Sequence, residues 1–150
     1  MVVELKKKSG NQSIGKNVAG FGTKIHLIMG RRDPIFVQIT GANTSDAKPA
    51  VEMLNLLNHK AINRFVGDKA YDTNKIRQEL DDMDIKAEIP NKRNRKKTFR
   101  FDQTIYKWRY RIENLFCRIK ENRRLSMRCD KLDTSFLAFI ALAFIKLIVC

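Results

Sequence analysis

The sequence contains no pair of cysteines in a CxxC arrangement, and its three cysteines, Cys117, Cys129 and Cys150, stand far apart. Zinc sites and disulfide frameworks in short chains depend on such spacings, so we predict reduced thiols and neither feature. The first ten residues include lysines but no apolar run, so we predict no secretory leader. These absences together predict a cytoplasmic protein.

No apolar run is long enough to cross a bilayer. The most apolar segment, SFLAFIALAFIKLIVC at 135–150, is interrupted by Lys146. A spanning helix needs about 20 consecutive apolar residues, so we predict a buried helix over 133–149 and no membrane partner. A membrane-surface protein that uses this helix and a positive charge is the alternative.

Acidic residues are scarce, since 16 of them stand against 30 Lys and Arg and leave a net charge of +14. A charge of this sign and size favours a polyanionic partner, most simply nucleic acid. The composition is 43% hydrophobic and 31% charged, which is typical of a folded chain. At 150 residues we predict one domain with a substantial core.

Turn residues divide the chain into short elements. Residues 1–20 are predicted to be irregular, with at most a short strand over 2–5. The region 21–90 is predicted to hold a sheet and helices, in the order β-β-α-β-α-β. The expected segments are a hairpin of strands at 22–29 and 35–41, a helix at 46–58, a strand at 62–68, a helix at 73–83 and a strand at 85–90. This order predicts an α/β fold with a mixed sheet.

A basic run, NKRNRKKTFR at 91–100, cannot be buried. Such runs are usually solvated loops, but this one directly precedes a basic helix predicted over 102–124, with Asp102 as its N-cap. We therefore define residues 91–101 as the basic loop and predict that it contacts nucleic-acid phosphates. The predicted contacts are Lys92, Arg93, Arg95, Lys96 and Lys97.

A carboxylate ends the third predicted strand. In RFVGDKAYD, residues 64–72, the apolar pair at 65–66 stops at Gly67 and is followed by Asp68. An acid at the C-terminal end of a strand is well placed to face a metal ion or a phosphate. Two roles are open for Asp72, which is either a functional carboxylate or the N-cap of the next helix.

The helix predicted over 102–124 has two distinct faces. At 100° per residue, one narrow face holds four polar side chains, Tyr106, Arg109, Glu113 and Lys120. A second face is apolar and is predicted to be buried, with Ile105, Trp108, Ile112, Leu115 and Ile119. Taken alone, Glu113 and Arg109 would be an ordinary ion pair at i, i+4.

The spacing Tyr-x2-Arg-x3-Glu-x6-Lys resembles the signature of bacterial insertion-sequence transposases with a DDE catalytic domain, in the group named for insertion sequences four and five. The segments GTKIH, ITGANTSDAKPA, GDKAYD, IPNKRNRKK and RCDKLDTSFLAFI resemble the same family in the same order, over about 12–149. This resemblance implies a ribonuclease-H-like fold. It also implies DNA transposition by cleavage and strand transfer at insertion-sequence ends, with DNA as partner and a homodimer as a further expectation.

The resemblance further implies three carboxylates that hold two divalent metal ions, Mg²⁺ or Mn²⁺. Asp68 matches the second carboxylate and Glu113 the third. Tyr106, Arg109 and Lys120 would then contact phosphates of the DNA. Two such ions can stabilise the attacking and leaving oxygens of a phosphodiester.

The first carboxylate of that family, expected on a central strand before the GTKIH segment, has no match. Asp33, Asp46 and Glu4 lie in other sequence contexts. We therefore predict an incomplete sheet whose first central strand is missing or poorly replaced. The whole chain, 1–150, would be a single truncated catalytic domain with two C-terminal helices over 102–150 and little or no cleavage activity. Non-catalytic nucleic-acid binding by the basic surface of 92–124 is the alternative.

Overall fold

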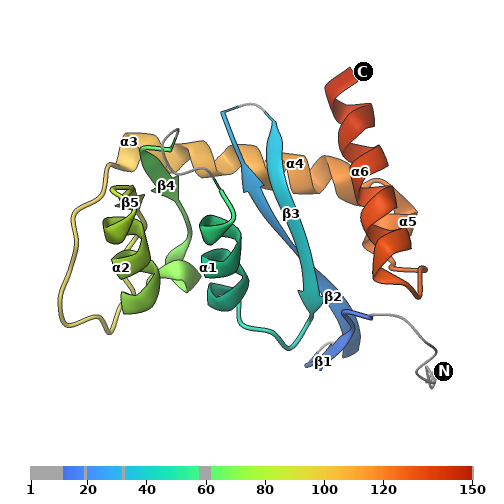
Figure 1. The fold of residues 1–150 in the computed structure, drawn as a ribbon, viewed down its shortest axis with the longest axis horizontal. Coiled ribbons are helices and arrows are strands. Elements are labelled where there is room, and N and C mark those ends of the chain that lie inside the picture. The colour runs from blue at the N-terminus through green and yellow to red at the C-terminus, as the bar shows by residue number, and fades with distance from the viewer. Residues whose placement is uncertain (1–11, 19, 32, 58–61, 150) are drawn as a thin grey trace.

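The computed structural model describes residues 12–18, 20–31, 33–57 and 62–149 (Figure 1). The strand predicted over 2–5 and the third cysteine lie outside these ranges. In chain order the strands are β1 (Gly15–Asn17), β2 (Gly20–Met29), β3 (Pro34–Gly41), β4 (Arg64–Val66) and β5 (Lys86–Glu88). The helices are α1 (Ala47–Asn55), α2 (Asn74–Asp82), α3 (Gln103–Tyr106), α4 (Tyr110–Lys120), α5 (Arg123–Ser126) and α6 (Asp133–Val149), with 3-10 turns η2 (Lys69–Tyr71) and η3 (Lys107–Arg109).

The predicted hairpin is confirmed as β2 and β3, which pair antiparallel with Ile25 opposite Ile39. The turn between them closes where the Gly30 amide donates to the Asp33 carbonyl at 2.8 Å. The short β1 adds to the start of β2 and gives the order β1-β2-β3. Alternating β-formers therefore produced the expected element.

β4 and β5 form a separate parallel pair, connected by α2, with Phe65 opposite Ala87. The α/β class is confirmed, and among the described residues the mixed sheet, which was predicted to be incomplete, consists of two small sheets with no ladder between them. α1 packs against β2 and β3 on one side and against η2 and α2 on the other. The two sheets are thus joined through a helix, because backbone pairing between them is absent in the described chain.

Two hydrophobic clusters match the two sheets. The first lies between the hairpin and the C-terminal helices and includes Ile39, Ile119, Phe136, Ile140 and Phe144. The second lies among α1, α2, β4 and β5 and includes Val51, Leu54, Ile76, Leu80, Ile85 and Ile89. Figure 1 shows the helical run α3–η3–α4 extending from the side that holds β4 and β5 to the side that holds α6.

The helix predicted over 102–124 is a helical run that ends at Lys120 and changes to 3-10 geometry at 107–109. Its predicted N-cap is confirmed, since Asp102 accepts from the amides of Thr104 at 2.8 Å and Ile105 at 3.3 Å. The predicted burial of Trp108 is wrong, because its side chain is 44% exposed. A 3-10 turn has about 3.0 residues per turn instead of 3.6, so a position inside it leaves the apolar face.

The predicted apolar helix is α6, and only one of its faces is buried. Phe136 and Ile140 belong to the first cluster, whereas Leu142, Ile145 and Ile148 are each more than half exposed. None of the helices in the described ranges is long and apolar enough to span a bilayer. The two described cysteines, 117 and 129, are exposed and free.

Candidate functional site

Asp68 follows β4 after one residue, Gly67, and is the N-cap of the 3-10 turn η2. Its Oδ1 accepts a hydrogen bond from the Ala70 amide at 2.8 Å, so one carboxylate oxygen caps this turn. The family resemblance implied that Asp68 is a metal ligand, and the structure shows that it caps this turn. Its side chain is only partly buried and remains open to a ligand.

Glu113 lies on α4 and forms an ion pair with Arg109, with 2.6 Å between Oε1 and Nη2. The Arg109 guanidinium lies 5.8 Å from the centre of the Tyr106 ring. The structure therefore brings three of the four predicted polar residues into one continuous series of contacts. The fourth, Lys120, is exposed at the last residue of α4.

The predicted metal ligands do not form a metal site within the described chain. No three His, Cys, Asp or Glu side chains of the described ranges gather closely enough to hold an ion. Glu113 is half exposed and engaged with Arg109. A two-metal centre needs several oxygen ligands around each pair of ions, so this arrangement does not fit one and we derive no chemical step through a metal.

Asp46 joins Asp68 beside a half-buried phenol, a relation that the sequence did not indicate. Burial, followed by the negative charges of Asp46 and Asp68, raises the pKa of Tyr71 to about 12. Asp46 also accepts from Lys24 Nζ at 3.0 Å, and the same ammonium donates to the Thr44 carbonyl at 2.7 Å. The start of α1, the strand β2 and the turn η2 therefore meet at one place.

His26 lies on β2, two residues beyond Lys24, and is buried. Its Nε2 lies 2.7 Å from Thr40 Oγ1 on β3. Burial lowers the pKa of His26, against the attraction of Asp46. This histidine is a hydrogen-bonded part of the hairpin and not a member of a described metal cluster.

Asp72 is fully buried and holds the basic loop against α2. It accepts from Arg77 Nε at 2.8 Å and from the Lys92 amide at 2.7 Å, and Arg95 Nη1 lies 3.0 Å away. Burial alone would raise the pKa of Asp72, but the hydrogen bonds from Lys92 and Arg77 and the charges of Arg77 and Arg95 lower it. The cap of α2 is Thr73, so the capping role considered for Asp72 is wrong.

The basic loop has a defined shape. At its two ends Asn91 and Phe99 exchange hydrogen bonds, of 2.8 Å to the Phe99 carbonyl and 2.9 Å from the Phe99 amide. The Phe99 ring lies 4.3 Å from the guanidinium of Arg77 and 4.9 Å from that of Arg95. Basic runs are usually solvated loops without fixed contacts, whereas this loop is held by cation–π contacts and by the hydrogen bonds between Asn91 and Phe99.

Arg95 differs from the other predicted phosphate contacts. Its guanidinium is directed inward to Asp72 and donates to Asn74 Oδ1 at 2.6 Å, and its side chain is 12% exposed. Four of the predicted contacts are exposed, as is one further cation of the loop: Lys92, Arg93, Lys96, Lys97 and Arg100. The structure thus separates one inward-facing cation from five outward-facing ones.

A buried acid also fixes the far end of the basic loop. Glu88 of β5 is fully buried, and its Oε1 pairs with Arg64 Nη1 at 2.6 Å. Its Oε2 accepts a hydrogen bond from the backbone amide of Asp102 at 2.6 Å, and Asp102 is the residue that caps α3. Glu88 therefore positions the start of the helical run that carries Glu113.

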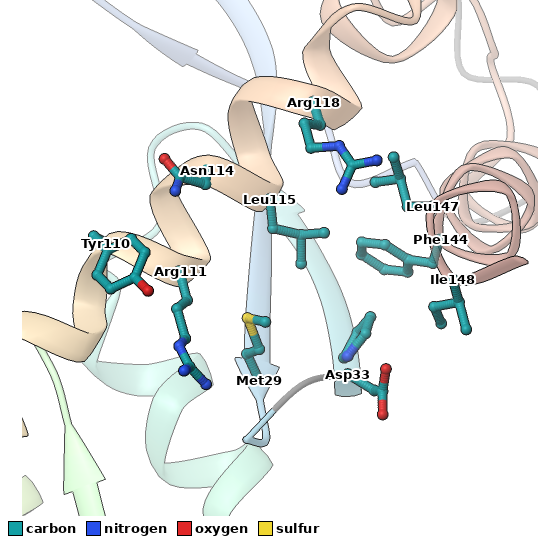
Figure 2. Close-up of a pocket in the computed structure, with 11 residues that line it drawn as sticks. Met29, Asp33, Tyr110, Arg111, Asn114, Leu115, Arg118, Phe144, Leu147 and Ile148 are labelled. Carbon is teal, nitrogen blue, oxygen red and sulfur yellow. The ribbon is translucent and has the colours of Figure 1, made fainter. Parts of the chain in front are cut away.

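A cavity of about 340 Å³ lies apart from these residues (Figure 2). It is formed by the β2–β3 turn, α4 and the C-terminal part of α6, and its lining includes Asp33, Arg111, Leu115, Arg118, Phe144 and Leu147. Figure 2 shows Leu115 and Phe144 approaching each other from α4 and α6, with Arg118 beside them. None of the predicted site residues lines this cavity.

Comparison with known proteins gives two matches. Residues 3–148 match the family described as "Transposase DDE domain". A protein of Brucella ovis named "Putative transposase for insertion sequence element IS6501" is 29% identical over 123 residues, which cover 81% of this chain and 93% of that protein. No solved structure matches the chain.

Proposed function

The chain belongs to the family of transposases with a DDE domain, and from this premise we propose that it acts on the DNA ends of an insertion sequence. Proteins of this family are enzymes of DNA transposition that bind DNA and use divalent metal ions. The observation that supports the proposal most is the contact series from Tyr106 through Arg109 to Glu113 on one helical run. A generic basic helix would not need this order of residues.

Within this proposal, Asp68 and Glu113 are the second and third carboxylates of the family. Asp68 follows a parallel strand and is partly open, and Glu113 is half exposed on a helix beside two residues that suit phosphate contact. Arg109 offers a planar, permanently charged group, which favours bidentate contact with phosphate oxygens. Tyr106, beside Arg109, and Lys120, at the end of α4, complete the proposed DNA contacts.

The division into two sheets supports a ribonuclease-H-like arrangement that lacks one strand. In that fold a first central strand lies between the hairpin and the parallel strands and carries the first carboxylate. Here the hairpin sheet and the β4–β5 pair are not connected by a ladder in the described chain, and no three acids, histidines or cysteines of the described residues gather into a group that could hold a metal ion. We therefore propose that the chain by itself is defective in strand cleavage.

The test is an assay of the whole chain on linear DNA that carries the ends of the element, with Mg²⁺ or Mn²⁺. We expect salt-dependent binding and little or no cleavage. Cleavage clearly above that of the Asp68→Ala/Glu113→Ala double variant would show that the proposed defect is wrong. Failure of the chain to bind any DNA at low salt would refute the proposed function itself.

Non-catalytic nucleic-acid binding is a second candidate, and the exposed cations of the basic loop favour it. Each neutralised phosphate contributes about −0.9 to the slope of log K against log salt. The double variant at Asp68 and Glu113 separates the candidates. The double variant should bind nucleic acid as the parent does, and it should show no metal-dependent cleavage.

A further inference from the structure

Two residues without positive charge, Asn91 and Asp72, hold the basic loop in shape. Asn91 bonds both backbone groups of Phe99, at 2.8 and 2.9 Å, and so closes the loop across eight positions. Asp72 holds the loop from inside through the Lys92 amide, at 2.7 Å, and the Arg95 guanidinium, at 3.0 Å. Both contacts join residues that are distant in sequence.

The burial of Asp72 explains why an acid is compatible with a basic surface. An exposed carboxylate among phosphate-binding cations would repel a polyanion. Asp72 is 2% exposed and is compensated by Arg77 and Arg95, whose side chains are 8% and 12% exposed. Its charge is therefore neutralised inside the protein, and the cations that remain exposed are left to an external partner.

We propose that Asp72 and Asn91 are positioning residues that hold the basic loop in the conformation in which its five exposed cations contact a nucleic-acid backbone. This inference depends on the proposed function only in that the partner is DNA. A loop already fixed in its bound shape pays less conformational entropy on binding than a mobile one. Arg95 then contributes through Asp72 and Phe99 and does not itself contact phosphate.

The first test is the affinity of Asn91→Ala for a DNA duplex of arbitrary sequence, measured below the unfolding temperature of the variant. This change leaves the net charge and every cation in place, so long-range attraction is unaltered. We expect binding to weaken about three- to ten-fold through loss of loop order. Asn94→Ala is the matched control, because Asn94 is exposed in the same loop and makes no hydrogen bond in the described chain.

The second test is Asp72→Asn, where two explanations predict opposite signs. Removal of a negative charge would strengthen DNA binding if charge alone mattered. If Asp72 positions the loop, the variant should bind more weakly in spite of its higher net charge. Asp81→Asn, an exposed site on α2, is the charge-matched control and should bind as tightly as the parent or slightly more tightly.

Amide hydrogen exchange supplies a measurement that does not depend on DNA. The amides of Lys92 and Phe99 donate to Asp72 and Asn91, so both should exchange faster in the two positioning variants, while amides of α2 remain unchanged. Variants that are folded and bind DNA as tightly as the parent would overturn the inference, as would unchanged exchange at both amides. Loss of DNA binding by the parent chain would instead contradict the proposed function and leave the exchange test of the loop in force.

Discussion

The Glu88 carboxylate on β5 and the Asp102 amide at the start of α3 lie 2.6 Å apart, with Glu88 completely shielded from solvent. This hydrogen bond connects the second sheet directly to the helical run that carries Glu113. The same carboxylate neutralises Arg64 on β4. One acid therefore fixes both the parallel strand pair and the direction in which the long helix leaves it.

Replacement of Glu88 by alanine should destabilise the protein by about 1–3 kcal/mol, because it leaves the part-buried Asp102 amide and the Arg64 guanidinium without their acceptor. Urea unfolding followed by circular dichroism measures the change. Glu121→Ala is the control, since this exposed glutamate at the end of α4 should change the free energy of unfolding by no more than about 0.5 kcal/mol. Equal effects of the two changes would contradict the role assigned to Glu88.

Alkaline pH should destabilise the protein through Tyr71. Its folded pKa of about 12 lies above the ordinary value of 10.0, so between these values the unfolded chain has lost a proton that the folded chain retains. Stability from this group is present below about pH 10 and is lost as pH rises towards 12. From pH 9 to 11 the parent should lose about 1 kcal/mol more unfolding free energy than Tyr71→Phe. Parallel pH profiles of the two proteins would contradict this prediction.

Acid should remove the contribution of Asp133, which lies at the start of α6. Burial opposes its ionisation, but hydrogen bonds from Ser13 and Arg128 at 2.7 Å lower its pKa below 3.8. A lowered folded pKa stabilises the protein above pH 3.8, and this stabilisation is lost as pH falls through the folded value. Asp133→Asn should therefore cost about 1–3 kcal/mol at pH 7 and progressively less below pH 4. A cost that does not depend on pH would argue against this ion pair.

Two glycines that face each other in the β1–β2 ladder should respond differently to alanine. A Cβ on Gly15 would lie 2.0 Å from Asn43 Oδ1 and 2.9 Å from the Ala42 amide nitrogen, whereas a Cβ on Gly22 would meet only a methyl group at 3.6 Å. Gly15→Ala should lower the unfolding free energy by about 1–3 kcal/mol. Gly22→Ala should leave it unchanged or raise it by up to about 1 kcal/mol. The melting temperatures of the two variants provide the comparison.

Elements whose signals are local were predictable from the sequence. The hairpin at 20–41 follows from alternating β-formers around a turn, and the Asp102 cap follows from one residue and its next three amides. The contact of Arg109 with Glu113 follows from helical spacing. In each case the partners are within a few residues or on adjacent strands, where the helix or strand periodicity determines which side chains are in contact.

The features that escaped prediction depend on distant partners or on a local change of geometry. Asp72 meets Arg77, Lys92 and Arg95 only after α2 and β5 have folded back on each other, so its role was not visible in GDKAYD. Trp108 was assigned to the apolar face by a constant 100° per residue, which the 3-10 turn at 107–109 does not obey.

The 3-10 turn η3 also has a mechanical consequence. The run from Gln103 to Lys120 touches β5 near one end and α6 near the other, so it links the two sides of the molecule in addition to α1, and its length has to match their separation. A 3-10 residue rises about 2.0 Å and an α-helical one about 1.5 Å, so rewinding three residues would shorten this strut by about 1.5 Å. The same rewinding would rotate Glu113 about the axis relative to Asp102. The overwound turn is thus a built-in adjustment of both spacing and orientation between the two halves of the molecule.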